Sequence, residues 1–164
     1  MAIYIPKHFS IKEYVPPHVY DERGDKAWEL MDARLLRSDD LLRERYGRVF
    51  INTWAFSSDP LGMTFRQSGL RTWQHYLEKG ANYHDPNPGQ EITAKEKYFR
   101  SYSQHKFGRA SDKKFMDVEV EEIRQDILTY CDAPWAEEIM SMELDTSWLH
   151  TDIRNCDRIK TYKP

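Results

Sequence analysis

Residues 101 to 112, SYSQHKFGRASD, place an imidazole, a glycine and a carboxylate in one short polar segment. His105 and Asp112 are seven positions apart, a separation of about 10 Å along a helix or about 23 Å along a strand. Two side chains that bind one metal ion must each bring a donor atom within about 2 Å of it. The chain would therefore have to reverse between them, and Gly108 can adopt the backbone angles that such a turn requires.

A second segment, SWLHTDIR, offers the residues that would complete a metal site. In a strand the side chains of Trp148, His150 and Asp152 share one face. His150 could then be a third ligand, with Asp152 supporting it through a hydrogen bond. Two histidines and one carboxylate, with the fourth position left to water, form a ligand set of catalytic zinc sites. The alternatives are a solvated loop histidine, an aspartate that caps a turn, and a tryptophan that belongs to the core rather than to a substrate groove.

These segments resemble a known family. SQHKFGRASD is similar to the S-x-H-x-x-G-x-A-x-D pattern of the zinc D-alanyl-D-alanine carboxypeptidases and L-alanyl-D-glutamate endopeptidases, which include VanX-like dipeptidases and phage endolysins. SWLHTD resembles the closing aromatic-x-His-x-Asp strand of that family, and RQSGLRTW resembles its S-G-[aromatic or aliphatic]-R segment. HFSIKEY is similar to the start of many phage-borne members, so that the resemblance extends from residue 8 to about residue 154.

The resemblance implies a role for each matching residue. His105, Asp112 and His150 would be the ligands of a Zn²⁺ cofactor, and Ser103 would hold the ligand loop or a group of the substrate. Arg71 would face the substrate carbonyl or carboxylate and the tetrahedral transition state, where a fixed guanidinium stabilises developing negative charge. The substrate would be a peptidoglycan stem peptide, and the bond that is cut would be an amide.

One position departs from the family pattern. A general base of the family, often glutamate, lies three positions before the last ligand histidine, and Ser147 occupies that place. Serine cannot take a proton from zinc-bound water at neutral pH. Asp145 and Glu143 are the candidate bases; in an unbroken strand Asp145 would point away from His150, so that it could serve only if a turn or bulge intervenes.

Two classes of function follow from these observations. The first is a zinc metallopeptidase of bacteriophage origin, an endolysin-like hydrolase or a carboxypeptidase that degrades the cell wall. The second is a virion or tail protein with structural or adaptor functions, which keeps the peptidase fold with a weakened or inactive site and binds other phage structural proteins. Ser147 and the prolines of the N-terminal segment motivate the second hypothesis. A metal-free binding domain would require the ligand matches to be accidental.

The composition limits the classes further. The chain has 164 residues, of which 40% are hydrophobic and 31% charged, as in a single globular domain. A net charge of -3 without a basic cluster argues against nucleic-acid binding. The N-terminus contains neither a signal peptide nor a membrane span, so that we expect the protein in the host cytoplasm before lysis or in the virion. Cys131 and Cys156 are isolated and are expected to be reduced thiols.

The pattern of apolar residues, prolines and glycines predicts an α+β fold, with helices packed on one side of a small antiparallel sheet that carries the metal site. We expect one domain over residues 1–164, in which residues 1–20 form an irregular arm where the HFSIKEY segment makes at most one helical turn. The expected helices cover residues 25–46, with a break near Ser38, and residues 71–78, 120–128 and 133–140. Strands are expected at residues 48–56, 141–145, 147–153 and 157–162, and residues 57–100 are otherwise expected to be loops.

Overall fold

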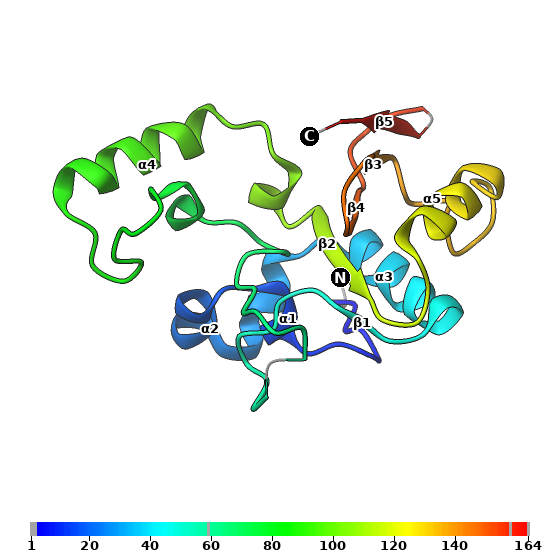
Figure 1. Ribbon diagram of the computed structural model, residues 1–164, viewed down its shortest axis with the longest axis horizontal. Coiled ribbons are helices and arrows are strands. Elements are labelled where there is room, and N and C mark those ends of the chain that lie inside the picture. Colours follow the sequence, from blue (N-terminus) through cyan, green and yellow to red (C-terminus); the bar gives the residue numbers. More distant parts are fainter. Residues whose placement is uncertain (1–2, 59, 158, 164) are drawn as a thin grey trace.

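The computed structural model describes residues 3–58, 60–157 and 159–163, and it confirms an α+β fold (Figure 1). The helices are α1 (Ile11–Tyr14), α2 (Pro17–Arg23), α3 (Ala33–Tyr46), α4 (Pro88–Arg100) and α5 (Val120–Thr129), with 3-10 helices η1 (Gly24–Leu30), η2 (Trp73–Tyr76) and η3 (Gln104–Phe107). The strands are β1 (Val49–Phe50), β2 (Ala110–Phe115), β3 (Ser141–Glu143), β4 (Leu149–Asp152) and β5 (Lys160–Tyr162). No helix in this part of the chain is long and apolar enough to cross a membrane.

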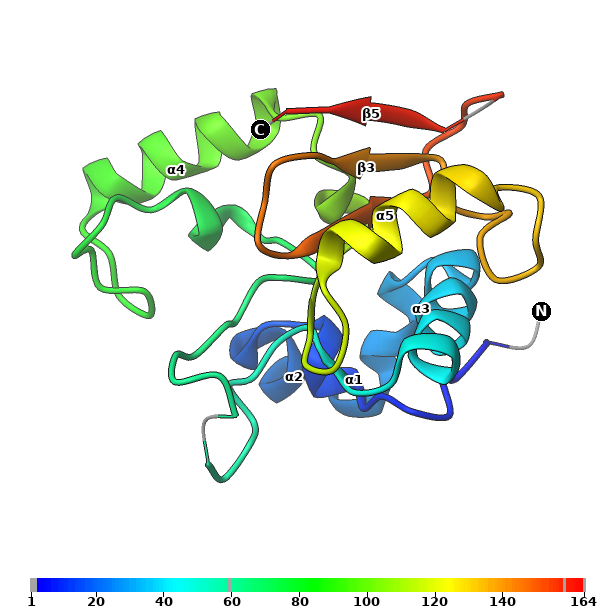
Figure 2. The same ribbon diagram turned by 45° about the vertical axis from the view of Figure 1, so that its right-hand side comes forward.

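The five strands form one mixed sheet in the order β1-β2-β4-β3-β5. The pairs β1–β2, β2–β4 and β3–β4 are antiparallel, as expected, but β5 is parallel to β3. The expectation of a purely antiparallel sheet is therefore wrong at its last strand. After β4 the chain does reverse its direction, but it passes beyond β3 before it pairs, and so β5 becomes the outer edge of the sheet (Figure 2).

The two faces of the sheet have different partners. Helices α3 and α5 cover one face, where Leu42 and Ile127 pack with Met142 and Leu149 in a buried cluster. Figure 2 shows α5 in front of this face and α3 below it. Side chains alternate along a strand, so residues one position away from these point to the opposite face. That second face carries Asp112 and His150, which are directly paired across β2 and β4.

The HFSIKEY segment forms a single helical turn, as expected, but the N-terminal segment as a whole is not an irregular arm. Helices α1 and α2 occupy most of residues 11–23, and at the start of α1 the amide of Ser10 donates to Oε1 of Glu13 at 3.0 Å. Tyr14 and Val15 are fully buried. This segment therefore forms part of the core, because its apolar side chains pack against η1, α3 and β1. Residues 1 and 2 lie outside the described part.

The long N-terminal helix is also divided differently from the prediction. The break falls at Asp32, whose side chain accepts the amide of Arg34 at 3.0 Å and caps α3, whereas the residues before it form the 3-10 helix η1. Ser38 lies inside α3 and is buried, and Gly47 ends the helix as expected. Aspartate is favoured as a helix cap, but the sequence alone did not distinguish Asp32 from Ser38.

Two further predicted elements are shorter than expected. Of residues 48–56 only Val49–Phe50 form a strand, because the amide of Asn52 donates to the carbonyl of Glu13 (3.0 Å) instead of to β2. Residues 71–78 contain only the single 3-10 turn η2. Residues 133–140 form consecutive turns rather than a helix, as in the bond from the amide of Ala136 to the carbonyl of Ala133 (2.8 Å). The strand predicted at 157–162 is shorter too, and position 158 lies outside the described residues.

Helix α4 lies where loops were expected. Its start has a clear physical cause, since Asn87 accepts the amide of Gln90 at 2.9 Å, Gln90 accepts the amide of Asn87 at 3.1 Å, and Pro88 is the first helical residue. Helix α4 and η2 contact each other and form a lobe over residues 72–104. Figure 1 shows α4 projecting from the sheet on the side away from α3 and α5.

Candidate metal centre

A 3-10 helix and a strand bring the first two predicted ligands together. His105 lies in η3, and Asp112 is the third residue of β2. Between them, Gly108 ends η3 in the left-handed conformation, with φ 63° and ψ 28°. The Nε2 atom of His105 consequently lies 3.3 Å from Oδ1 of Asp112. The predicted reversal of the chain is confirmed.

Gly108 is required at this turn for a second reason. A Cβ atom at this position would lie 2.0 Å from the carbonyl oxygen of Leu30, which belongs to the backbone and cannot rotate away. The carbonyl of Gly108 itself accepts the amide of Asp32 at 3.0 Å. The turn between the two ligands is therefore held directly against the cap of α3.

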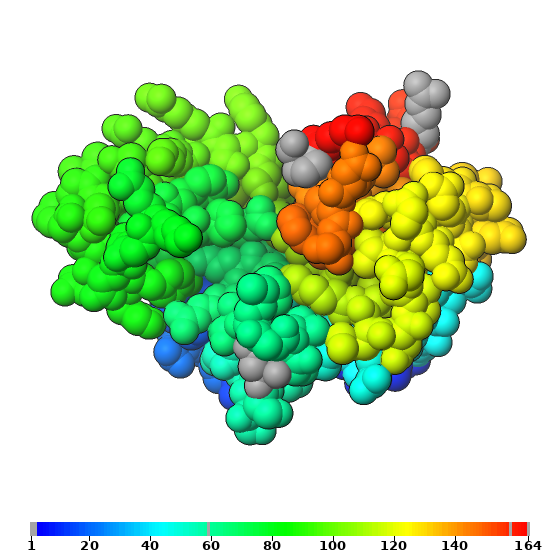
Figure 3. All heavy atoms as spheres, in the orientation of Figure 1, coloured from blue at the N-terminus to red at the C-terminus, as the bar shows by residue number. Residues whose placement is uncertain are grey.

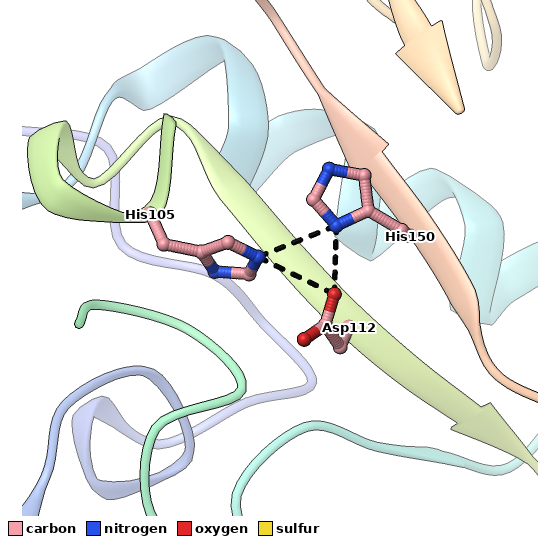
Figure 4. A group of neighbouring side chains, drawn as sticks. All are labelled: His105, Asp112 and His150. Atoms are coloured by element: carbon pink, nitrogen blue, oxygen red, sulfur yellow. Dashed lines mark hydrogen bonds and ion pairs between the residues drawn. The ribbon is translucent and has the colours of Figure 1, made fainter. Parts of the chain in front are cut away.

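His150 completes the cluster from the neighbouring strand. It is paired with Asp112 across β2 and β4, and its Nδ1 atom lies 2.7 Å from Oδ1 of Asp112 and 3.3 Å from Nε2 of His105. Figure 4 shows the three side chains converging from η3, β2 and β4. All three are buried. Ligands of a tetrahedral zinc ion at 2.0–2.1 Å are about 3.3 Å apart, so that two of the three distances already have the value that a bound ion requires.

The protons on the two imidazoles test whether a cation fits. Nδ1 of His105 lies 2.7 Å from the carbonyl oxygen of Gly69, which can only accept a hydrogen bond, so Nε2 of His105 presents a lone pair. Nε2 of His150 lies 3.5 Å from Oδ2 of Asp152, which in its ionised form also only accepts. In neutral His150 the Nδ1 atom then also presents a lone pair. Two nitrogens and one carboxylate oxygen of Asp112 thus point at one another. A proton would satisfy only one pair of them, whereas a divalent cation would satisfy all three.

Asp152 is well placed for the supporting role predicted for it. It is fully buried, and Arg154 donates to it through Nε at 2.8 Å and through Nη2. Burial would raise the pKa of Asp152, but Arg154 and His150 lower it to about 2, so that it is ionised at neutral pH. An ionised Asp152 fixes the ring orientation and the tautomer of His150.

The charges around the other ligands favour a neutral imidazole beside an ionised carboxylate. Burial lowers the pKa of His105 to about 4, although Asp112 opposes this shift. Burial would raise the pKa of Asp112, but His105, His150 and Arg71 hold it well below its ordinary value. Both states are the ones that metal ligands require.

Arg71 is held against the cluster at a fixed distance. Its Nη2 donates to Oδ2 of Asp112 at 2.6 Å and its Nε donates to the carbonyl of Gln67 at 3.1 Å. Asp112 therefore directs Oδ1 toward the two imidazoles, where a cation could bind, and uses Oδ2 for Arg71. Gly69, two positions earlier, supplies the acceptor for His105, and a Cβ atom at Gly69 would lie 2.3 Å from the carbonyl oxygen of Tyr14. The role of Gly69 was not predicted, although Gly69 belongs to the RQSGLRTW segment that resembles the peptidase family.

The two candidate bases have different surroundings. Met142 is paired with Thr151 across β3 and β4, and Glu143 is the next residue of β3. Burial would lower the pKa of His150, but its hydrogen bonds with Asp112 and Asp152 and the charges of Asp112 and Glu143 raise it. Asp145 follows β3 in the turn that leads to β4, with a positive φ of 59°. Its carboxylate is 63% exposed and forms an ion pair with Lys163 at 2.6 Å. The required turn is present, but the described contacts of Asp145 lead away from the ligands, and Glu143 is the carboxylate beside the cluster.

A cavity of about 270 Å³ opens beside the cluster and is bordered by Asp112, Arg71 and Trp148. Figure 3 shows this face hollowed between the green segment, the yellow-green segment near residue 115 and the orange segment near residue 145. The indole nitrogen of Trp148 is buried without a hydrogen-bond partner in the described part. Trp148 therefore borders the cavity, so of its two predicted positions, the core and a groove beside the site, the structure has the second.

Two further residues shape the surroundings. Lys114 also borders the cavity, and its Nζ donates to Oγ of Ser68 at 2.6 Å; burial lowers its pKa to about 8. The alternation of side chains along β2 places Lys114 on the face of Asp112. Because no strand was predicted over these residues, Lys114 was not identified from the sequence. Ser103 begins η3, where its carbonyl accepts the amide of Lys106 at 3.1 Å. The backbone of Ser103 thus helps to hold the ligand loop.

Comparison of the chain with protein-family models, with curated proteins and with solved structures gave no match.

Proposed function

We propose that this protein is a zinc-dependent peptidase, encoded by a bacteriophage, that hydrolyses amide bonds in the stem peptides of peptidoglycan as an endopeptidase or D,D-carboxypeptidase. The observation that carries the proposal is the convergence of two imidazole nitrogens and one carboxylate oxygen, within 3.3 Å of one another, beside an open cavity. Catalytic zinc sites use three protein ligands of this kind and leave one position open. The substrate class comes from the resemblance of the SQHKFGRASD, SWLHTD and RQSGLRTW segments to peptidoglycan peptidases.

The residues of the chain have distinct tasks in this reaction. His105, Asp112 and His150 would hold the ion, and zinc, when bound, supplies the Lewis acidity that activates water and polarises the scissile carbonyl. The guanidinium of Arg71 stabilises negative charge on the carbonyl oxygen in the tetrahedral transition state. The carboxylate of Glu143 accepts a proton from the attacking water and delivers it to the departing amine.

The test begins with the metal and continues with hydrolysis. We expect one zinc per chain by elemental analysis, and cleavage of purified stem peptides that a chelator abolishes. His105→Ala should lose both the zinc and the cleavage. His84→Ala provides a matched control, because His84 is exposed in a loop of the lobe and should change neither. Unchanged hydrolysis in His105→Ala would contradict the proposal.

The same experiment identifies the alternative function. Stoichiometric zinc without turnover of any cross-linked or linear stem peptide would favour a virion or tail protein that retains an inactive site. Ser147, which replaces the usual base, is the residue that favours this alternative. Cleavage by the wild-type protein would exclude it.

A further inference from the structure

The metal-site face of the sheet carries one continuous row of polar side chains across four strands. Asp112 is paired with His150 across β2 and β4, Ser141 is paired with Asp152 across β3 and β4, and Glu143, two residues after Ser141, is paired with Tyr162 across β3 and β5. Residues that are directly paired point to the same face of a sheet. Tyr162 therefore lies at the outer end of the row that begins with two of the three proposed ligands.

The ring of Tyr162 has a defined position at the site. It packs edge to face on the ring of His150, with the centroids 6.0 Å apart and the planes at 74°. The guanidinium of Arg154 lies over the Tyr162 ring, 5.5 Å from its centroid. Its hydroxyl, in contrast, forms no hydrogen bond with any residue that the structure describes. A half-buried, oriented phenol with a free donor is thus present beside His150 and Glu143.

Strand β5 is attached firmly enough to keep Tyr162 in this place. The amide of Leu144 donates to the carbonyl of Tyr162 at 2.7 Å, and the amide of Lys160 donates to the carbonyl of Met140 at 2.9 Å. Lys163 forms its ion pair with Asp145 directly after the strand. This pair gives Asp145 a structural role, because it ties the end of β5 to the turn between β3 and β4.

We propose that Tyr162 is a substrate-binding residue, whose hydroxyl donates a hydrogen bond to an acceptor oxygen in the leaving-group segment of the peptide. This inference rests on the proposed function. Arg71 lies at the Asp112 end of the row and faces the carbonyl side of the scissile bond, whereas Tyr162 lies beyond Glu143, which protonates the departing amine. A peptide that crosses the row from Arg71 to Glu143 therefore brings its leaving segment to Tyr162.

The variant Tyr162→Phe tests this contact, because it removes the hydroxyl and keeps the ring on His150 and Arg154. With zinc-loaded protein and a soluble stem pentapeptide, kcat/KM should fall about tenfold, which corresponds to about 1.4 kcal/mol for one hydrogen bond. By titration calorimetry, the affinity for the product with the new amino group, which contains the leaving segment, should fall about tenfold. The affinity for the product with the new carboxylate should stay unchanged. The zinc content and the thermal midpoint should equal those of the wild type.

Tyr130→Phe is the matched control, since Tyr130 is exposed next to the end of α5 and should show no change. Equal kcat/KM and equal product affinities in Tyr162→Phe and wild type would overturn the inference and leave the peptidase intact. A wild type that binds the pentapeptide without cleaving it would overturn the hydrolysis alone, provided that Tyr162→Phe still loses about tenfold in affinity. A wild type that neither binds nor cleaves it would overturn both.

Discussion

The backbone amide of Arg71 donates a hydrogen bond to the carbonyl oxygen of His105 at 3.1 Å. The lobe of residues 72–104 therefore leaves the site at Arg71 and returns to it at His105. Because Arg71 also binds Asp112, the cationic side chain and two proposed zinc ligands are fixed relative to one another. Because this bond joins both ends of the lobe, a change of structure in its projecting part need not move the site.

The choice between the two candidate bases is open to a direct comparison. Glu143→Gln should lower kcat by a factor of about 10² to 10⁴, the usual contribution of a general base, and keep the zinc. Asp145→Asn should change kcat only a few-fold, because it removes an ion pair between side chains that are 63% and 74% exposed. Kinetics on stem peptides and elemental analysis of both variants provide the measurement. A large loss of activity in Asp145→Asn with normal activity in Glu143→Gln would reverse the assignment.

The hydrogen bond between Asp152 and His150 should be visible in the affinity for zinc. Asp152→Asn keeps the shape of the side chain but removes the charge that fixes the tautomer of His150. We expect zinc affinity to fall about 10- to 100-fold in a competition assay with a chromogenic chelator. Asp132→Asn, at an exposed position, is the control and should bind zinc as the wild type does. Wild-type affinity in Asp152→Asn would show that Asp152 does not support the ligand.

A fully buried ion pair lies on the helix-covered face of the sheet, behind the site. Nζ of Lys113 is 2.9 Å from Oδ1 of Asp39 and donates to Ser111 and Thr151. Lys113→Met should leave the Asp39 carboxylate buried and unpaired, and lower the free energy of unfolding by about 3–5 kcal/mol. Urea unfolding measures this change, and Lys79→Met at an exposed position should stay within about 0.5 kcal/mol of the wild type.

The double variant Lys113→Met, Asp39→Asn makes the prediction stricter. It removes both charges, so that its loss of stability should be smaller than that of Lys113→Met alone. Losses that simply add would show that the two side chains do not interact.

Glu13 should make stability depend on pH around neutrality. Burial raises the pKa of Glu13 from 4.5 to about 7, even though the amide of Ser10 and the charge of Arg43 lower it. The folded state thus holds a proton that the unfolded state has lost, and the associated stability is complete below pH 4.5 and disappears as the pH rises through about 7. Glu13→Gln cannot lose this proton, so between pH 5 and pH 8 the wild type should become less stable relative to it, by on the order of 3 kcal/mol.

Urea unfolding of the two proteins at several pH values provides the measurement. Glu29→Gln is the control, because Glu29 is exposed and should leave the pH dependence unchanged. Parallel stability profiles of Glu13→Gln and wild type would contradict the raised pKa.

The sequence by itself was sufficient to propose that His105, Asp112 and His150 lie together, and to explain why the chain turns between the first two. The spacing of His105 and Asp112 demanded a reversal, and Gly108 was the residue that allowed it. The alternation of side chains along β4 was sufficient to place His150 and Asp152 on one face. These features depend on neighbours within a few positions, where local backbone geometry dominates.

The tertiary structure decided everything that depends on strand order and on buried partners. Whether Glu143 or Asp145 lies beside His150 depends on the register of β3 against β4, and Tyr162 reaches the row only because β5 passes beyond β3 and pairs in parallel. The capping signal of α4 was present in the sequence, but a lobe that packs mostly against itself has no long apolar face to reveal it. Pairing between distant segments is set by how a whole core is filled, and no short stretch of sequence contains that information.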